Sequence, residues 1–157
     1  MLWRGLNSGP PDDSAEGQTL GKAYRMAIKV YIVEDHPELR EVLGMLIEYE
    51  PALELCGSAA TGEEALVQLV EAEAHVVLVD MFLPQMNGAD LIMKLQTQRP
   101  DLRCVVLSGH ADTSYVKRAL AAGARGYILK GKPDEILEAI QHVMAGGIYL
   151  SALLRYG

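Results

Sequence analysis

The chain alternates short β-branched runs with stretches of helical apolar period, and this alternation constrains its fold more than any other feature. Five runs read as strands, at residues 28–33, 53–59, 74–80, 103–108 and 126–129. Each is followed by apolar residues spaced three and four apart, as on one face of a helix. Strand-then-helix repeats imply a parallel sheet with right-handed crossovers and helices on both faces. We therefore expect a doubly wound α/β domain with five parallel strands.

Helix boundaries are marked by residues that favour particular helix ends. Thr61 with Glu64 forms a capping box, and Asn87 can cap the helix after the central strand. Gly123 suits a left-handed cap at the end of the next helix. The last helix is expected to begin near Pro133.

Polar residues stand where four of the predicted strands end. Glu34 and Asp35 follow the first strand, Asp80 ends the third, Ser108 ends the fourth, and Lys130 follows the fifth. In doubly wound sheets the functional site lies beyond the carboxyl ends of the strands. We therefore expect these five residues to meet at one edge of the sheet.

This set of residues favours metal-assisted phosphoryl chemistry. Two carboxylates about 4 Å apart repel by about 4 kcal/mol at an effective dielectric of 20, so the cluster needs a cation or a shared proton. Mg²⁺ suits oxygen ligands best, and an Asp80 oxygen beside it can attack phosphorus while Ser108 and Lys130 stabilise the transferred charge. Singly, Lys130 could be a solvated lysine, Ser108 a turn residue, and the acidic pair a helix N-terminal charge.

Around these residues the sequence resembles the receiver domain of two-component response regulators, from about residue 27 to residue 147. The resemblance is carried by VEDHP, LVDMFLPQMNG, VVLSG and GARGYILKGKP; the last, followed by EAIQHVMAGGIYLS, is similar to the NarL/LuxR-type subfamily. It implies a flavodoxin-like, CheY-like fold with strand order 2-1-3-4-5. It also implies a phosphorylation-controlled switch in signal transduction, with only self-catalysed phosphoryl transfer and slow autodephosphorylation as chemistry of its own.

The resemblance assigns a role to each site residue. Asp80 would accept phosphate from a sensor histidine kinase, and Mg²⁺ would be held by Asp35, Asp80 and the backbone carbonyl of Phe82, with Glu34 assisting. Ser108 and Lys130 would then bind the phosphoryl oxygens. Tyr127 occupies the position of the family's aromatic switch, although packing at the sheet edge is a simpler interpretation.

Output is expected through the surface of the fourth helix, fifth strand and fifth helix, and a homodimer could form on phosphorylation. The subfamily usually continues into a helix-turn-helix domain for transcription regulation, so residues 148–157 are expected to begin a linker or form a C-terminal tail. A stand-alone receiver that acts through protein–protein contacts is the alternative. One departure is that Lys130 is followed by Gly131, so the family's Lys-Pro step is absent.

Two other classes use a similar arrangement. A haloacid dehalogenase would need a second Asp two residues after the nucleophile, where Phe82 stands. A flavodoxin would need a hydroxyl-rich phosphate loop after the first strand, where this chain has EDHPEL.

Net charge and the length of the apolar runs argue against two kinds of partner, nucleic acids and membranes. The net charge of -7 and pI of 5.0 argue against nucleic-acid contact by this chain itself. No apolar run approaches the roughly 20 residues that span a bilayer, so we expect a cytoplasmic protein without membrane contact. Residues 1–25, rich in Gly, Pro, Ser and Asp, are expected to be a flexible extension or leader, and residues 26–147 the receiver domain. Cys56 and Cys104 are expected to be reduced core thiols.

Overall fold

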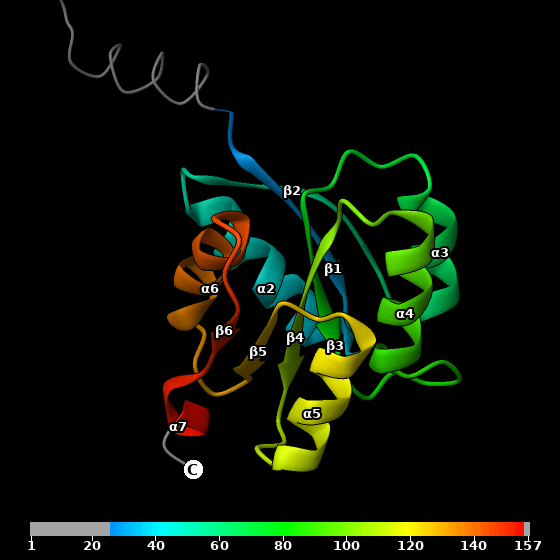
Figure 1. Cartoon of the computed structure of the whole chain (residues 1–157). Helices are drawn as coiled ribbons and strands as arrows, with labels where there is room; N and C mark the ends of the chain where they lie inside the picture. The colour runs from blue at the N-terminus through cyan, green and yellow to red at the C-terminus, as the bar shows by residue number, and fades with distance from the viewer. Residues whose placement is uncertain (1–25, 156–157) are drawn as a thin grey trace, which may run out of the picture.

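The computed structural model describes residues 26–155, which form a parallel sheet between two layers of helices (Figure 1). The sheet has six strands in the order β2-β1-β3-β4-β5-β6. Their bounds are β1 Ile28–Val33, β2 Leu53–Ala59, β3 Val76–Asp80, β4 Arg103–Ser108, β5 Gly126–Leu129 and β6 Tyr149–Leu150. The helices are α2 Pro37–Tyr49, α3 Gly62–Leu69, α4 Gly88–Gln98, α5 Thr113–Ala122, α6 Glu135–Met144 and α7 Ala152–Arg155.

The doubly wound α/β fold and the order of the first five strands are confirmed, but the expected number of five strands was wrong. Gly146, in the left-handed region at φ 100°, ends the turn after α6 and lets the chain return along β5. The N–H of Tyr149 donates to the Arg125 carbonyl at 2.9 Å, and the N–H of Ser151 donates to the Tyr127 carbonyl at 3.0 Å. These bonds add β6 as a sixth parallel strand, within the stretch where a linker or tail was expected to begin.

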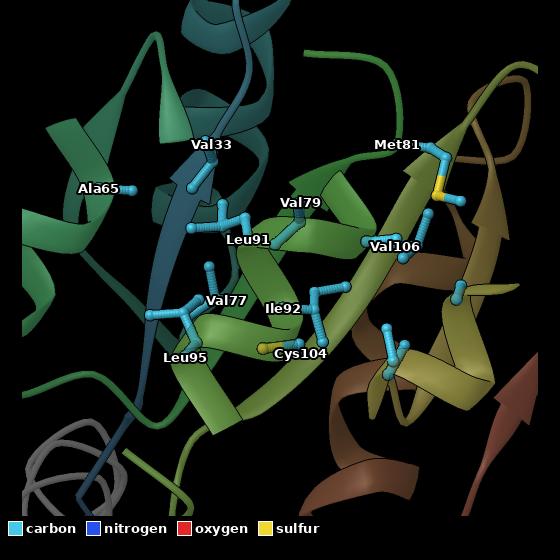
Figure 2. Packing of buried hydrophobic residues seen from close by; sticks show 14 of the residues in the cluster. Val33, Ala65, Val77, Val79, Met81, Leu91, Ile92, Leu95, Cys104 and Val106 are labelled. Carbon is cyan, nitrogen blue, oxygen red and sulfur yellow. The ribbon is translucent and has the colours of Figure 1, made fainter. Parts of the chain in front are cut away.

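The two faces of the sheet are covered by different helices, as an alternation of strand and helix requires. Apolar side chains of α3, α4 and α5 pack on one face, and those of α2 and α6 pack on the other. Figure 2 shows Leu91, Ile92 and Leu95 of α4 against the sheet residues Val77 and Val106, all of them fully buried. Because both faces are covered, the central strands read as nearly continuous apolar runs.

The local signals at helix ends act as expected. Thr61 Oγ1 accepts from the Glu64 N–H at 3.1 Å, and the Glu64 carboxylate reaches back to the N–H of Ala60 at 3.0 Å, one residue before the N-cap of the expected capping box. Asn87 caps α4 through the Asp90 N–H, at 2.9 Å. These caps fix where each helix leaves the carboxyl edge of the sheet.

The expectation for residues 1–25 lies outside the described part of the chain. Within residues 26–155, no helix combines the length and the apolar character that crossing a bilayer requires. Both cysteines are free thiols on separate strands, Cys56 on β2 and Cys104 on β4.

Candidate functional site

The structure brings the predicted polar residues to one edge of the sheet. Asp80 ends β3 and Ser108 ends β4, while Glu34 and Asp35 follow β1 and Lys130 follows β5. All these strands are parallel, so their carboxyl ends lie side by side. The site is therefore a product of strand order and direction.

Lys130 brings a positive charge to the buried carboxylates of this site. Its Nζ lies 3.3 Å from Glu34 Oε1 and 3.3 Å from Asp80 Oδ2, and both carboxylates are almost fully buried. The backbone N–H of Lys130 donates to the Ser108 carbonyl at 2.8 Å. Lys130 thus links the ends of three neighbouring strands.

One ammonium group does not neutralise two buried carboxylates. Burial, together with the nearby charge of Glu34, raises the pKa of Asp80 to about 6, although the N–H of Phe82 and the ammonium of Lys130 act to lower it. The edge therefore carries excess negative charge at neutral pH, which a cation would compensate.

The acidic residues form a set that could hold a metal ion. One ligand atom from each of Glu34, Asp35, His36 and Asp80 lies within 4.8 Å of the others. Glu34 Oε1 and Asp35 Oδ1 are buried oxygens that accept no hydrogen bond from the described residues. The ammonium of Lys130 lies 3.3 Å from Glu34 Oε1 but makes no hydrogen bond to it. Carboxylate oxygens are the ligands that Mg²⁺ prefers, so the residues present fit this ion.

A tightly packed loop fixes Asp80. The Phe82 N–H donates to Asp80 Oδ1 at 3.2 Å, and the Gly88 N–H donates to the Met81 carbonyl at 2.9 Å. A Cβ atom on Gly88 would collide with the Asp80 carbonyl oxygen and lie 2.9 Å from Met81 Cα. Glycine is therefore required at the start of α4 so that the helix can approach the end of β3.

Ser108 and Tyr127 are connected through His110 rather than through the acidic cluster. Ser108 is fully buried, and its Oγ accepts from the His110 N–H at 3.1 Å. The hydroxyl of Tyr127 donates to the His110 carbonyl at 2.7 Å, and the whole Tyr127 residue is buried. The aromatic residue that was expected to act as a switch thus lies in its inward position.

Three rings form a wall beside Asp80. The Phe82 ring lies 4.6 Å from the His110 ring and 5.0 Å from the Tyr115 ring, and the His110 and Tyr115 rings are 5.4 Å apart. Phe82 is 43% exposed, and its N–H is bonded to Asp80 Oδ1, so this wall reaches solvent next to Asp80. This wall joins the loop after β3 to the loop and helix after β4.

Two residues next to the site, His36 and Tyr115, were not predicted from the sequence. His36 Nδ1 lies 3.0 Å from Glu34 Oε2, and this contact raises the pKa of the imidazole. Its only signal was its place in the run EDHP. Tyr115 was missed because a helix brings it to Phe82 across 33 residues of sequence, and only its aromatic character marked it.

Fold and site together define a class, namely a doubly wound domain with a buried acidic cluster and a lysine at the carboxyl edge of its sheet. The family model for the response regulator receiver domain matches residues 30–141. The chain therefore belongs to the response regulator receiver family, a family of switches in two-component signal transduction rather than of ordinary enzymes.

Characterised relatives agree with this assignment. The chain is 35% identical over 124 residues to the transcriptional regulatory protein DegU of Brevibacillus brevis, covering 78% of this chain and 52% of that protein. It is 34% identical over 125 residues to the response regulator GacA of Pseudomonas protegens, covering 79% of this chain and 59% of that protein. The chain thus spans between half and three-fifths of the length of these relatives.

Solved structures place it in the same group. A LuxR-family response regulator from Aurantimonas sp. SI85-9A1 superposes with a TM-score of 0.80 at 27% identity, over 83% of this chain and 94% of that one. A CheY-like receiver from Methanospirillum hungatei JF-1 gives a TM-score of 0.69 at 28% identity, over 76% and 94% of the two chains. The match to a NarL/LuxR-type receiver is therefore supported by both sequence and fold.

Proposed function

We propose that this receiver is switched when Asp80 accepts a phosphoryl group from the phosphohistidine of a sensor kinase. The observation that carries the proposal is the position of Asp80, buried at a strand end with Lys130 3.3 Å from its Oδ2. One carboxylate oxygen forms the new bond to phosphorus while the P–N bond to the kinase imidazole breaks. The imidazole leaves with the electron pair of that bond and takes up a proton.

Different residues around Asp80 would bind the metal ion and the transferred phosphoryl group. Asp35, Asp80 and the Phe82 carbonyl would hold Mg²⁺, with Glu34 assisting, because their oxygens form the acidic cluster or its adjoining loop. When bound, this ion supplies positive charge that stabilises the phosphoryl oxygens. Lys130, whose Nζ lies 3.3 Å from Asp80 Oδ2, would supply a second positive charge.

Ser108 and Tyr127 would pass the change outward. The Ser108 hydroxyl would donate to a phosphoryl oxygen, and a shift of Ser108 toward Asp80 would pull on the His110 N–H that its Oγ accepts from. Because the His110 carbonyl also holds the Tyr127 hydroxyl, this movement would reach β5. The output surface would comprise α5, β5 and α6.

Transcription regulation is the output that the relatives favour. The names of DegU and of the DNA-binding transcriptional activator DevR/DosR of Mycobacterium tuberculosis, which is 35% identical over 120 residues, describe regulators of transcription. We infer that phosphorylation promotes pairing of two copies, in the cytoplasm, and that the DNA contact is made outside this domain. A receiver acting alone through protein contacts is the second candidate.

Intact mass after incubation with Mg²⁺ and acetyl phosphate tests the central step. The wild-type chain should gain the mass of one phosphoryl group, and Asp80→Asn should gain none. Asp112→Asn is the matched control, because Asp112 is an exposed carboxylate before α5, and it should label like the wild type. Equal labelling of Asp80→Asn would disprove the assignment.

A further inference from the structure

A buried serine connects the segment after β6 to the strand that carries the switch. Ser151 is fully buried, and its N–H donates to the Tyr127 carbonyl at 3.0 Å. Its Oγ accepts from the Leu129 N–H at 2.9 Å and donates to Glu135 Oε1 at 2.5 Å. The hydroxyl of Ser151 thus both donates and accepts, and it joins β5 to α6.

Glu135, the first residue of α6, completes this connection. It is only 8% exposed, and its Oε2 accepts from the Ala152 N–H at 3.0 Å. Burial alone would raise the pKa of Glu135, but hydrogen bonds from Ser151 and Ala152 hold it below its usual value. A charged carboxylate with donors of this kind makes strong hydrogen bonds. We call Glu135 and Ser151 the latch.

The latch holds Leu129, the residue directly before Lys130 of the acidic site. Leu129, whose N–H it holds, precedes Lys130, whose own N–H is bonded to the Ser108 carbonyl on the opposite side of β5. The side chain of Lys130 contacts Asp80 and Glu34. The end of β5 is therefore held from one side by the site and from the other side by the latch.

We propose that the latch holds residues 149–155 against β5 and loosens when Asp80 is phosphorylated. This rests on the function proposed above. A phosphoryl group on Asp80 draws the Lys130 ammonium toward its oxygens, and the Leu129 N–H shifts away from Ser151. Because coupling between sites is reciprocal, breaking the latch also frees the end of β5.

Amide hydrogen exchange measured by NMR tests the proposal in the full chain, with and without acetyl phosphate and Mg²⁺. The reporters are the N–H groups of Ala152 and Leu154, which are bonded to Glu135 and to the Ser151 carbonyl. Their exchange should become about threefold faster or more on phosphorylation, as for a locally opened segment. Intact mass of the same sample gives the phosphorylated fraction.

Variants distinguish the loss of the latch from a general loosening of the domain. In Ser151→Ala, Ala152 and Leu154 should exchange fast without phosphate and respond no further, while the mass gain remains. Glu135→Gln should give a smaller change in the same direction, and Ser58→Ala, a half-buried serine on β2, should behave like the wild type.

Unchanged or slower exchange in fully phosphorylated wild type would overturn the latch, as would a retained response in Ser151→Ala. A wild-type chain that gains no mass would instead count against the proposed function. In that case the latch is tested by the exchange rate of the Lys130 amide in the unphosphorylated variants. Its exchange should be faster in Ser151→Ala than in Ser58→Ala without phosphate, and equal rates would refute the latch.

Discussion

The Nζ of Lys130 lies 3.3 Å from Oδ2 of Asp80, yet the carboxyl group is less acidic than a free one. Burial and the charge of Glu34 outweigh the ammonium, so the pKa of Asp80 is raised from 3.8 to about 6. Ionised Asp80 is consequently a source of instability in the metal-free protein, and this can be measured.

Asp80→Asn should stabilise the metal-free chain at neutral pH. Since the pKa of Asp80 is higher in the folded than in the unfolded state, its stabilising contribution is present below about pH 4 and is lost as the pH rises through about 6. The advantage of the variant in free energy of unfolding should therefore grow over this range, by up to about 3 kcal/mol. Urea unfolding in a chelator at pH 4, 6 and 8 measures it.

Asp112→Asn provides the reference, because this exposed carboxylate lies outside the acidic cluster. Its difference from the wild type should stay within about 0.5 kcal/mol across the same range. A pH-independent difference for Asp80→Asn would contradict the raised pKa.

Phe82→Asn should shorten the lifetime of the phosphorylated state severalfold at fixed Mg²⁺ and pH. Hydrolysis needs a water aligned with phosphorus and opposite the Asp80 oxygen. The apolar Phe82 ring, in tilted and edge-to-face contact with His110 and Tyr115, should keep water from approaching Asp80, whereas an amide could hold one. Loss of the phosphoryl mass with time measures the rate.

Two further variants complete that measurement. Phe82→Leu keeps an apolar side chain and should stay close to the wild-type rate, while His110→Ala should slow the loss or change it little. Decay of Phe82→Asn at the wild-type rate or slower would show that water access past this position does not set the lifetime.

Tyr127→Phe should lower the free energy of unfolding by about 1 kcal/mol, because it removes the hydrogen bond to the His110 carbonyl without opening a cavity. Tyr49→Phe is the control, since Tyr49 is 89% exposed and should be neutral. Urea denaturation of both variants is sufficient. Equal stability of Tyr127→Phe and the wild type would mean that the hydroxyl contributes nothing in its inward position.

Gly88→Ala should destabilise the domain by about 1–3 kcal/mol and weaken Mg²⁺ binding, because the new methyl group pushes α4 away from Asp80. Gly131→Ala adds the same methyl group with no heavy atom within 4 Å and should change neither property. Thermal unfolding and calorimetric Mg²⁺ titration compare the two. A tolerated Gly88→Ala would show that the loop after β3 can move.

Strand ends were the predictable part of this protein. The apolar run before Asp80 and the β-branched run before Glu34 each identify a buried strand, and parallel strands carry their final residues to the same edge. From the residue types at that edge, an acidic cluster beside Lys130 could be predicted without any coordinates. The pairing of Lys130 with Glu34 as well as Asp80 could not, because it depends on the course of a side chain.

Short elements and loop contacts were the unpredictable part. Tyr149 and Leu150 make a strand of two residues, too short for any alternation to reveal. The contacts of His36 with Glu34 and of Tyr115 with Phe82 depend on loop conformations that no period encodes. The inward position of Tyr127 is likewise a rotamer choice that its spacing from Lys130 does not determine.

The sixth strand also covers a sheet edge through which copies of the protein could associate. Without residues 149–151, β5 would become the outermost strand of the sheet and present unpaired N–H and C=O groups to other molecules. Exposed strands of this kind add strands from neighbouring chains and seed aggregation. A fragment ending at residue 147 would therefore be prone to precipitate, whereas one that continues through residue 155 retains its own cover.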